Sequence, residues 1–315
     1  INTSGRQKQY LNIIRVGRGM KEGNNLIFTF FQGKKQLYNY SSAGGNSATP
    51  NYQLTGFTIE SRHQFDQNNY VIVEAGKSSS PFYRRMVRKE GILQSMLSLK
   101  DRNNEAYAVR FSSYIPSTNT RITGMYKHTG ADYQSFSYFT SSTTQNAWSL
   151  RAEQAFFKQR LQITGSLRKN DFSNPYLAGN VQSKTIFKTI QASLRLKKWP
   201  VLSAGYFPVS QLIKVSDNEY RENFYHTFTG SLVYGYHVKN RQMSTMISFV
   251  QFYNSNADSN FVYFNTRNII LHHSMYFKGL TLQITGSEIL STDYRLFTEG
   301  AALQCRLKEW LLMGA

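Results

Sequence analysis

The sequence RLQITGSLR at residues 160–168 changes chemical character at every position. Leu161, Ile163 and Leu167 share one side of an extended chain, whereas arginine, glutamine, threonine and serine fill the other. Because successive side chains of a β-strand point to opposite faces, this alternation predicts a strand with one apolar and one polar face. Residues 280–287, LTLQITGS, repeat the pattern, so the chain uses this two-sided strand more than once.

Most of the chain divides into similar amphipathic segments. They lie near residues 9–16, 25–33, 54–65, 69–76, 91–100, 105–115, 120–129, 132–140, 147–157, 185–197, 201–207, 224–238, 242–253, 261–273 and 294–308. This gives about 17 candidate strands in all, and about 9 to 11 residues is the length with which a tilted strand crosses a bilayer. We therefore expect one all-β domain over residues 1–315, a transmembrane antiparallel up-and-down β-barrel of about 14–18 strands.

The composition fits such a protein. The 22 Phe and 21 Tyr residues favour strands, because aromatic side chains fit pleated surfaces. The mean hydropathy of −0.46 does not exclude a barrel, since only every second residue of its strands faces lipid. The sequence contains no run of about 18 apolar residues, which excludes helical membrane spans.

The connections between the segments are of two kinds. Residues 66–69, 101–104 and 239–242 read as tight polar turns. Longer connections, rich in Gly, Ser, Asn and Pro, are expected at 33–51, 77–90, 170–182, 208–222 and 254–260. Short turns on one rim and long loops on the other are typical of outer-membrane barrels.

Two short sequences recur within the chain. LQITGS occurs at 161–166 and at 282–287, each with a mid-strand glycine, which permits a sheet to bend. RLKKW at 195–199 is echoed by RLKEW at 306–310. Convergence of similar hairpins and true duplication both explain these echoes.

Tryptophan and lysine at strand ends suit the headgroup layer of a membrane. The expected interface anchors are Trp148, Trp199, Trp310, Lys197 and Lys308. After Trp310 the chain begins another strand and stops at Ala315. We therefore expect the sequence to be part of a longer polypeptide with further N- and C-terminal segments.

The formal charge of +19, from 37 Lys and Arg against 18 Asp and Glu, calls for an anionic environment or partner. The basic residues are scattered along the chain, which suits lipid and lipopolysaccharide better than nucleic acid. The polar strand faces predict a basic lumen formed by Arg110, Arg151, Arg160, Arg168, Arg195 and Arg306. A network in which these arginines pair with acids such as Glu153 is an equally good interpretation.

Catalytic or metal chemistry has little support in the sequence. His272 and His273 are adjacent, but neighbours on a strand face opposite sides and cannot serve one site. No zinc-binding helix motif, nucleophile elbow or phosphate loop occurs. Cys305 reads as a small apolar side chain between Leu303 and Leu307. We expect no enzyme activity, no cofactor and no metal.

Aromatic, Asn-rich strands, basic turns, and Gln, Thr and Ser on the polar faces together resemble outer-membrane barrels of the Bacteroidota. The resemblance spans nearly the whole chain, but it is one of style and transfers no functional residue. It implies a place in the outer membrane of a Gram-negative envelope.

The sequence thus predicts an outer-membrane barrel. It would act as a porin-like channel, with anionic solutes as one candidate cargo, or as the membrane-embedded part of a transport, secretion or assembly complex with other envelope proteins. The alternative is a soluble all-β surface protein that binds glycans. Nucleic-acid binding ranks last.

Overall fold

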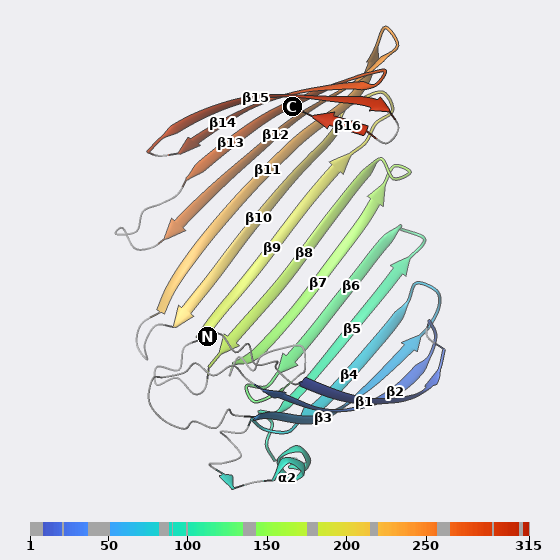
Figure 1. Cartoon of the computed structure of the whole chain (residues 1–315), viewed down its shortest axis with the longest axis vertical. Helices are drawn as coiled ribbons and strands as arrows, with labels where there is room; N and C mark the ends of the chain where they lie inside the picture. The colour runs from blue at the N-terminus through green and yellow to red at the C-terminus, as the bar shows by residue number, and fades with distance from the viewer. Residues whose placement is uncertain are drawn as a thin grey trace, which may run out of the picture.

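In a computed structural model of the chain, one antiparallel sheet contains all the strands of the described residues (Figure 1). The structure describes residues 9–20, 22–36, 51–81, 88–89, 91–98, 100–134, 143–174, 182–214, 220–256, 265–291, 293–308 and 311–314. The strands are β1 (Gln9–Gly19), β2 (Asn25–Gln36), β3 (Asn51–Gln64), β4 (Tyr70–Ser78), β5 (Glu105–Ile115), β6 (Thr120–Thr129), β7 (Thr144–Phe156), β8 (Leu161–Ser173), β9 (Gln182–Leu194), β10 (Val201–Lys214), β11 (Tyr220–Val238), β12 (Arg241–Asn256), β13 (Thr266–Phe277), β14 (Leu280–Ser291), β15 (Arg295–Lys308) and β16 (Leu311–Gly314).

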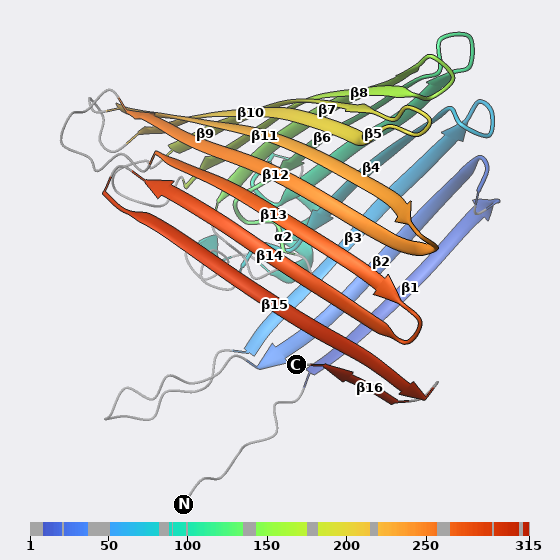
Figure 2. The same ribbon diagram turned by 90° about the horizontal axis from the view of Figure 1, so that it is seen from above.

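Each strand pairs with its neighbours in sequence, so the 16-stranded sheet follows an up-and-down order from β1 to β16. The sheet is strongly curved (Figure 2), and its two ends lie apart, with β1 near one end of the long axis of the molecule and β15 and β16 near the other (Figure 1). Within the described residues the sheet ends at β1 and β16, which do not pair with each other. The predicted all-β, antiparallel, up-and-down topology is confirmed, whereas closure into a barrel is not shown.

One predicted strand is wrong. Residues 91–100 contain a short helix, α2 (Ile92–Leu97), in which the amide of Ser95 donates to the carbonyl of Gly91 at 3.0 Å. Met96 and Ser95 are buried, while Leu93 and Leu97 are exposed. Gln94, two residues after Ile92, is exposed, whereas Ser95 and Met96, three and four residues after it, are both buried, which is helical rather than strand spacing. The segment 132–140 is also not a strand as far as Gln134, and the rest of it lies outside the described residues.

The two rims differ as expected, except that most of the long connection predicted at 208–222 is strand, because β10 extends to Lys214 and β11 begins at Tyr220. One, called the short-turn rim, joins strands through turns such as 65–69, 116–119 and 239–240. Lys239 and Asn240 both have positive φ, 46° and 65°, the two-residue turn that matches the twist of a hairpin. Residues 101–104 do not form the predicted hairpin turn, because they complete the long connection from β4 through α2 to β5. That connection lies on the opposite, long-loop rim.

The sheet has two chemically different faces. The polar face includes Arg110 and Arg151, and the apolar face includes Phe228 and Leu271, as the continuous strand register places them. The buried hydrophobic residues of the described chain are only Leu54, Met96, Ala131 and Ala147. The apolar side chains therefore do not form a core between packed layers.

Mid-strand glycines fall into two groups. A Cβ added to Gly124 would collide with the ring of Phe111, which covers it on the apolar face. Gly165 and Gly286, at equivalent places of the two LQITGS repeats, have no atom near the position of a Cβ. Packing therefore requires a glycine at position 124, whereas it does not require one at positions 165 and 286.

The structure contains no helix, among the described residues, that is long and apolar enough to cross a membrane.

Candidate functional site

The polar face carries more basic than acidic side chains. Where side chains are described, its basic residues are Arg15, Arg62, Arg110, Arg121, Lys127, Arg151, Arg168 and Arg221. Its acids are Glu60, Glu74 and Glu153. The basic residues lie mainly on β1 to β8. The polar face of β12 to β14 instead carries uncharged side chains, mostly hydroxyls and amides.

Two of the predicted lumen arginines pair with these acids. Arg110 Nη2 lies 3.4 Å from Glu74 Oε2, and Arg151 Nη2 lies 2.6 Å from Glu153 Oε1. All four side chains are partly open to solvent, so each pair stabilises the sheet by at most about 1 kcal/mol. Each pair holds its guanidinium group close to the polar face of the sheet.

Arg168 makes a different contact. Its guanidinium carbon lies 5.0 Å from the centre of the Phe187 ring, a cation–π arrangement across β8 and β9. Among the described residues, none of the ion pairs includes Arg168. Within the described part of the chain, no neighbouring carboxylate therefore offsets the positive charge of Arg168.

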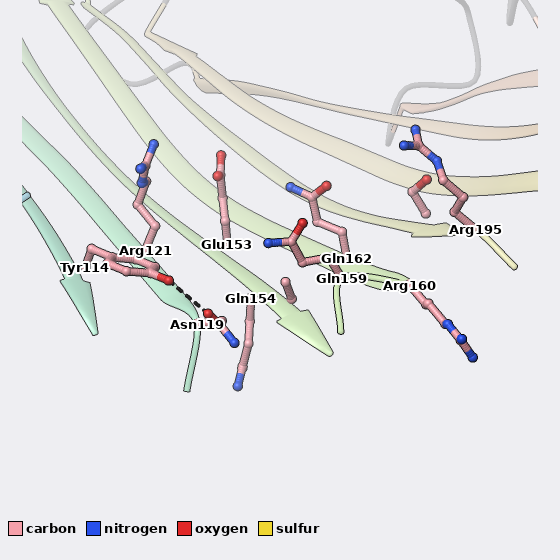
Figure 3. Close-up of a pocket in the computed structure, with 11 residues that line it drawn as sticks. Tyr114, Asn119, Arg121, Glu153, Gln154, Gln159, Arg160, Gln162 and Arg195 are labelled. Carbon is pink, nitrogen blue, oxygen red and sulfur yellow. Dashed lines mark hydrogen bonds between the residues drawn. The ribbon is translucent and has the colours of Figure 1, made fainter. Parts of the chain in front are cut away.

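Arg160 and Arg195 lie at the short-turn rim, beside a hollow of about 410 Å³ (Figure 3). Arg121, Glu153 and Gln162 extend from the sheet on one side, whereas Arg160 points away from them. The backbone amide of Arg195 donates to the carbonyl of Arg160 at 2.7 Å, which holds the two turns together. Arg195 thus belongs with the polar face, and Arg160 does not.

The hollow also contains a residue that the sequence reasoning missed. Arg121 lies with its guanidinium carbon 6.0 Å from the ring centre of Tyr114, whose hydroxyl donates to Asn119 Oδ1 at 2.8 Å. The alternation of residues 121–127, RITGMYK, could have identified both Arg121 and Lys127 as polar-face residues.

The remaining predicted basic residue, Arg306, lies in β15 opposite Leu312. Its side chain and that of Lys308 are outside the described part of the structure, as is Trp310.

A second hollow, of about 540 Å³, lies under residues 130–133 on the polar face. Gly130 and Asp132 donate their amides to the carbonyls of Glu105 and Asn103, both at 2.8 Å, which ties this segment to the start of β5. Burial, with a smaller effect from the charge of Glu74, raises the pKa of Tyr133 to about 12.

The predicted interface anchors lie at both ends of the strands. Trp148 is on the apolar face near the long-loop rim, opposite Tyr126 on one side and Lys169 on the other. Trp199 and Lys197 are exposed in the connection between β9 and β10. Lys169 was not among the predicted anchors, although its spacing from Leu167 places it on the same face.

The adjacent histidines face opposite sides, as their spacing predicted. On the polar face, His272 lies 2.9 Å from both Thr285 Oγ1 and Ser274 Oγ. On the apolar face, His273 Nδ1 lies 2.9 Å from Thr245 Oγ1. The described residues contain no group of three or more His, Cys, Asp or Glu side chains that could hold a metal ion.

No protein-family model matches the chain, and no curated protein matches it. Among solved structures, it is similar to a chain described as "Bacterial polysaccharide outer membrane secretin". The TM-score is 0.36 at 9% sequence identity, and the alignment covers 95% of this chain and 98% of that one. At this level the likeness identifies neither a family nor a function, and the resemblance to Bacteroidota barrels stays one of style.

Proposed function

We propose that the chain forms a β-barrel in the bacterial outer membrane and conducts small anionic solutes. The observation that carries the proposal is the exposure of large apolar side chains on one face of a single curved sheet, which the proposal places outward, toward lipid. Ile14, Phe228, Leu271 and Ile284 are 61%, 45%, 48% and 45% exposed. An apolar surface of this extent would promote aggregation in water, and a hydrocarbon environment removes the problem.

The height of the apolar face fits a bilayer. On β11, the aromatic residues Phe224 and Tyr236 stand at the two ends of a face that carries His226, Phe228, Gly230, Leu232 and Tyr234 between them. Their separation along the strand is about 40 Å, which a tilt of about 40° reduces to about 30 Å across the membrane. Apolar bands with aromatic girdles of this height are typical of outer-membrane barrels.

Basic residues on the apolar face are also compatible with a lipid environment. Lys169 and Lys184 lie near the long-loop end of β8 and β9, level with or beyond Trp148, where lipid phosphates would be found. Lys188 lies further in, and its long side chain can extend toward the headgroups while its stem stays in the apolar layer. Phospholipid and lipopolysaccharide are accordingly the expected lipid partners.

Closure of the sheet follows from the same proposal. The free edges of β1 and β16 would expose unpaired amides and carbonyls, and each unsatisfied group costs several kcal/mol in lipid. Because β1 and β16 are the ends of an even series of antiparallel strands, they run in opposite directions and can pair as neighbours do elsewhere in the sheet.

The polar interior supports conduction of anions. A barrel of about 16 strands is too wide for its own side chains to fill, and it leaves an aqueous channel. The excess of arginine over glutamate on this wall would raise the local concentration of anions.

Planar bilayers test this function. Under a KCl gradient, the purified protein should conduct with a reversal potential on the anion-selective side. A preference for cations, or no ion flow at all, would contradict the channel. Extraction by alkaline carbonate without detergent would contradict the membrane location and favour the soluble glycan-binding alternative.

A role within a larger envelope complex has one supporting observation. Leu11 and Ile13 on β1 occupy polar-face positions at the free edge and are 38% and 57% exposed. A partner strand or segment could cover them. Copurification of defined envelope proteins after mild detergent extraction would favour this role, and a lone conducting monomer would count against it.

A further inference from the structure

We propose that the polar wall of β8 to β12 binds an acidic oligosaccharide. Four aromatic side chains on this wall, Phe187, Phe207, Tyr225 and Phe252, form what is here called the aromatic strip, and each is half-buried. The ring centres of Tyr225 and Phe252 are 6.0 Å apart, with 27° between their planes. The inference rests on the proposed function only in requiring that this face be open to water.

The strand register brings the four rings together. Phe187 and Tyr225 flank Val209 from either side at one level of the wall. Phe207 and Phe252 flank Thr227 at the next level. The strip therefore crosses four adjacent strands, and no ring is separated from the group by a charged side chain.

At least one of these rings lies along the wall. The edge of the Phe207 ring is 2.7 Å from the position of a Cβ on Gly205, two residues earlier on the same strand. The side chain therefore folds back over the glycine instead of extending into the interior. A ring held this way presents its broad surface to whatever passes along the wall.

The surroundings of the strip are rich in uncharged hydrogen-bonding groups. The neighbouring polar-face residues are Thr189, Gln211, Asn223, Thr227 and Asn254. A pyranose ring has an apolar C–H face that stacks on an aromatic ring, and hydroxyls that bond to amides and hydroxyls. A purely apolar ligand would leave these groups without hydrogen-bond partners, which disfavours its binding relative to that of a sugar.

The size and charge of the wall define the ligand further. From β8 to β12 there are four strand spacings, roughly 19 Å, which is the length of an oligosaccharide rather than of a single sugar. Arg168 stands at one end, with its guanidinium 5.0 Å from the centre of Phe187. Stacking fixes the guanidinium plane and leaves its N–H groups free to bind a sugar carboxylate in a bidentate manner.

Isothermal titration calorimetry on the detergent-solubilised protein tests the proposal, with trigalacturonate as the acidic probe and maltotriose as the neutral one. We expect trigalacturonate to bind and Phe252→Leu or Tyr225→Leu to weaken it at least tenfold. Phe252→Tyr should preserve binding, since it keeps the ring. Arg168→Gln should remove the preference for trigalacturonate over maltotriose.

The matched control is Tyr253→Leu, because Tyr253 follows Phe252 on β12 and faces the opposite side. It should leave binding unchanged. Equal losses in Tyr253→Leu and Phe252→Leu, or no binding of trigalacturonate, would overturn the inference. If the protein conducts anions but does not bind trigalacturonate, the oligosaccharide site is contradicted and the channel is not. If it binds trigalacturonate without conducting anions, only the channel is contradicted.

Discussion

A lysine placed at Leu271 should destabilise the folded protein in a bilayer far more than a lysine placed at Ile270. Leu271 lies on the apolar face of β13 and is 48% exposed, whereas its neighbour Ile270 lies on the polar face between Ser248 and Ser287. The two residues share a strand and are similar in size, so the substitutions differ mainly in the side of the sheet they charge.

The expected magnitude follows from the position of Leu271. It lies five residues from the start of β13 and six from its end. At about 3.4 Å per residue and a tilt of about 40°, it is about 13 to 16 Å from either end, close to the middle of a band about 25 Å high. A lysine at that depth costs about 2–4 kcal/mol, which lowers the folding equilibrium constant by about 30- to 700-fold.

Reversible urea titration of the protein in phospholipid vesicles, followed by the mobility of unheated samples in SDS gels, measures both costs. Leu271→Ala measures the free energy of unfolding lost with the side-chain contacts alone, without an added charge. Ile270→Lys should lower the free energy of unfolding by much less than Leu271→Lys does. Equal costs for the two lysines, or a Leu271→Lys variant as stable as the parent, would refute the assignment of the apolar face to lipid.

Three further outcomes are expected. Gly124→Ala should lower the free energy of unfolding by about 1–3 kcal/mol because Phe111 occupies the space, whereas Gly165→Ala should be neutral or slightly stabilising; urea midpoints compare them. Neutralising Arg110, Arg151 and Arg168 together as glutamines should shift the reversal potential toward zero, and an unchanged potential would remove them from the selectivity mechanism. A hydrogen bond from the Asn69 side chain, together with backbone amide hydrogen bonds from Asn68 and Asn69 at 2.8 and 2.9 Å, lowers the pKa of Asp66 from its ordinary value of 3.8. The stability that Asp66 adds should therefore be present above pH 3.8 and be lost as the pH falls through the lowered pKa, where the difference in unfolding midpoint between the parent and Asp66→Ala should vanish.

Much of the fold could be predicted because strand alternation is a local property. Residues 160–168 and 280–287 needed no tertiary information, since each side chain is assigned to a face by its neighbours alone. The helix Ile92–Leu97 was missed because six residues of mixed character fit both periodicities. The turn predicted at 101–104 failed for the same reason, since it depended on a strand before it.

The candidate site was less accessible to sequence reasoning. Alternation placed Arg110, Arg151 and Arg168 on a polar side, but it could not provide the partners. Glu74 lies 36 residues from Arg110 in the chain, and the two meet only because β4 and β5 pair in one register. Arg160 is an even number of residues from Arg168, which would place both on the polar face of one strand. Arg160 lies in a turn, however, where the alternation of a strand no longer determines the direction of a side chain.

The sequence by itself determined that the chain forms long two-sided strands joined by short turns on one rim, because side-chain direction within a strand depends only on residue order. The tertiary structure decided which residues meet across strands. The aromatic strip illustrates the difference: Phe187, Phe207, Tyr225 and Phe252 are scattered over four segments, and only the pairing register of β9 to β12 places their rings side by side. Register is a relation between strands, and a shift of one residue would send each ring to the opposite face.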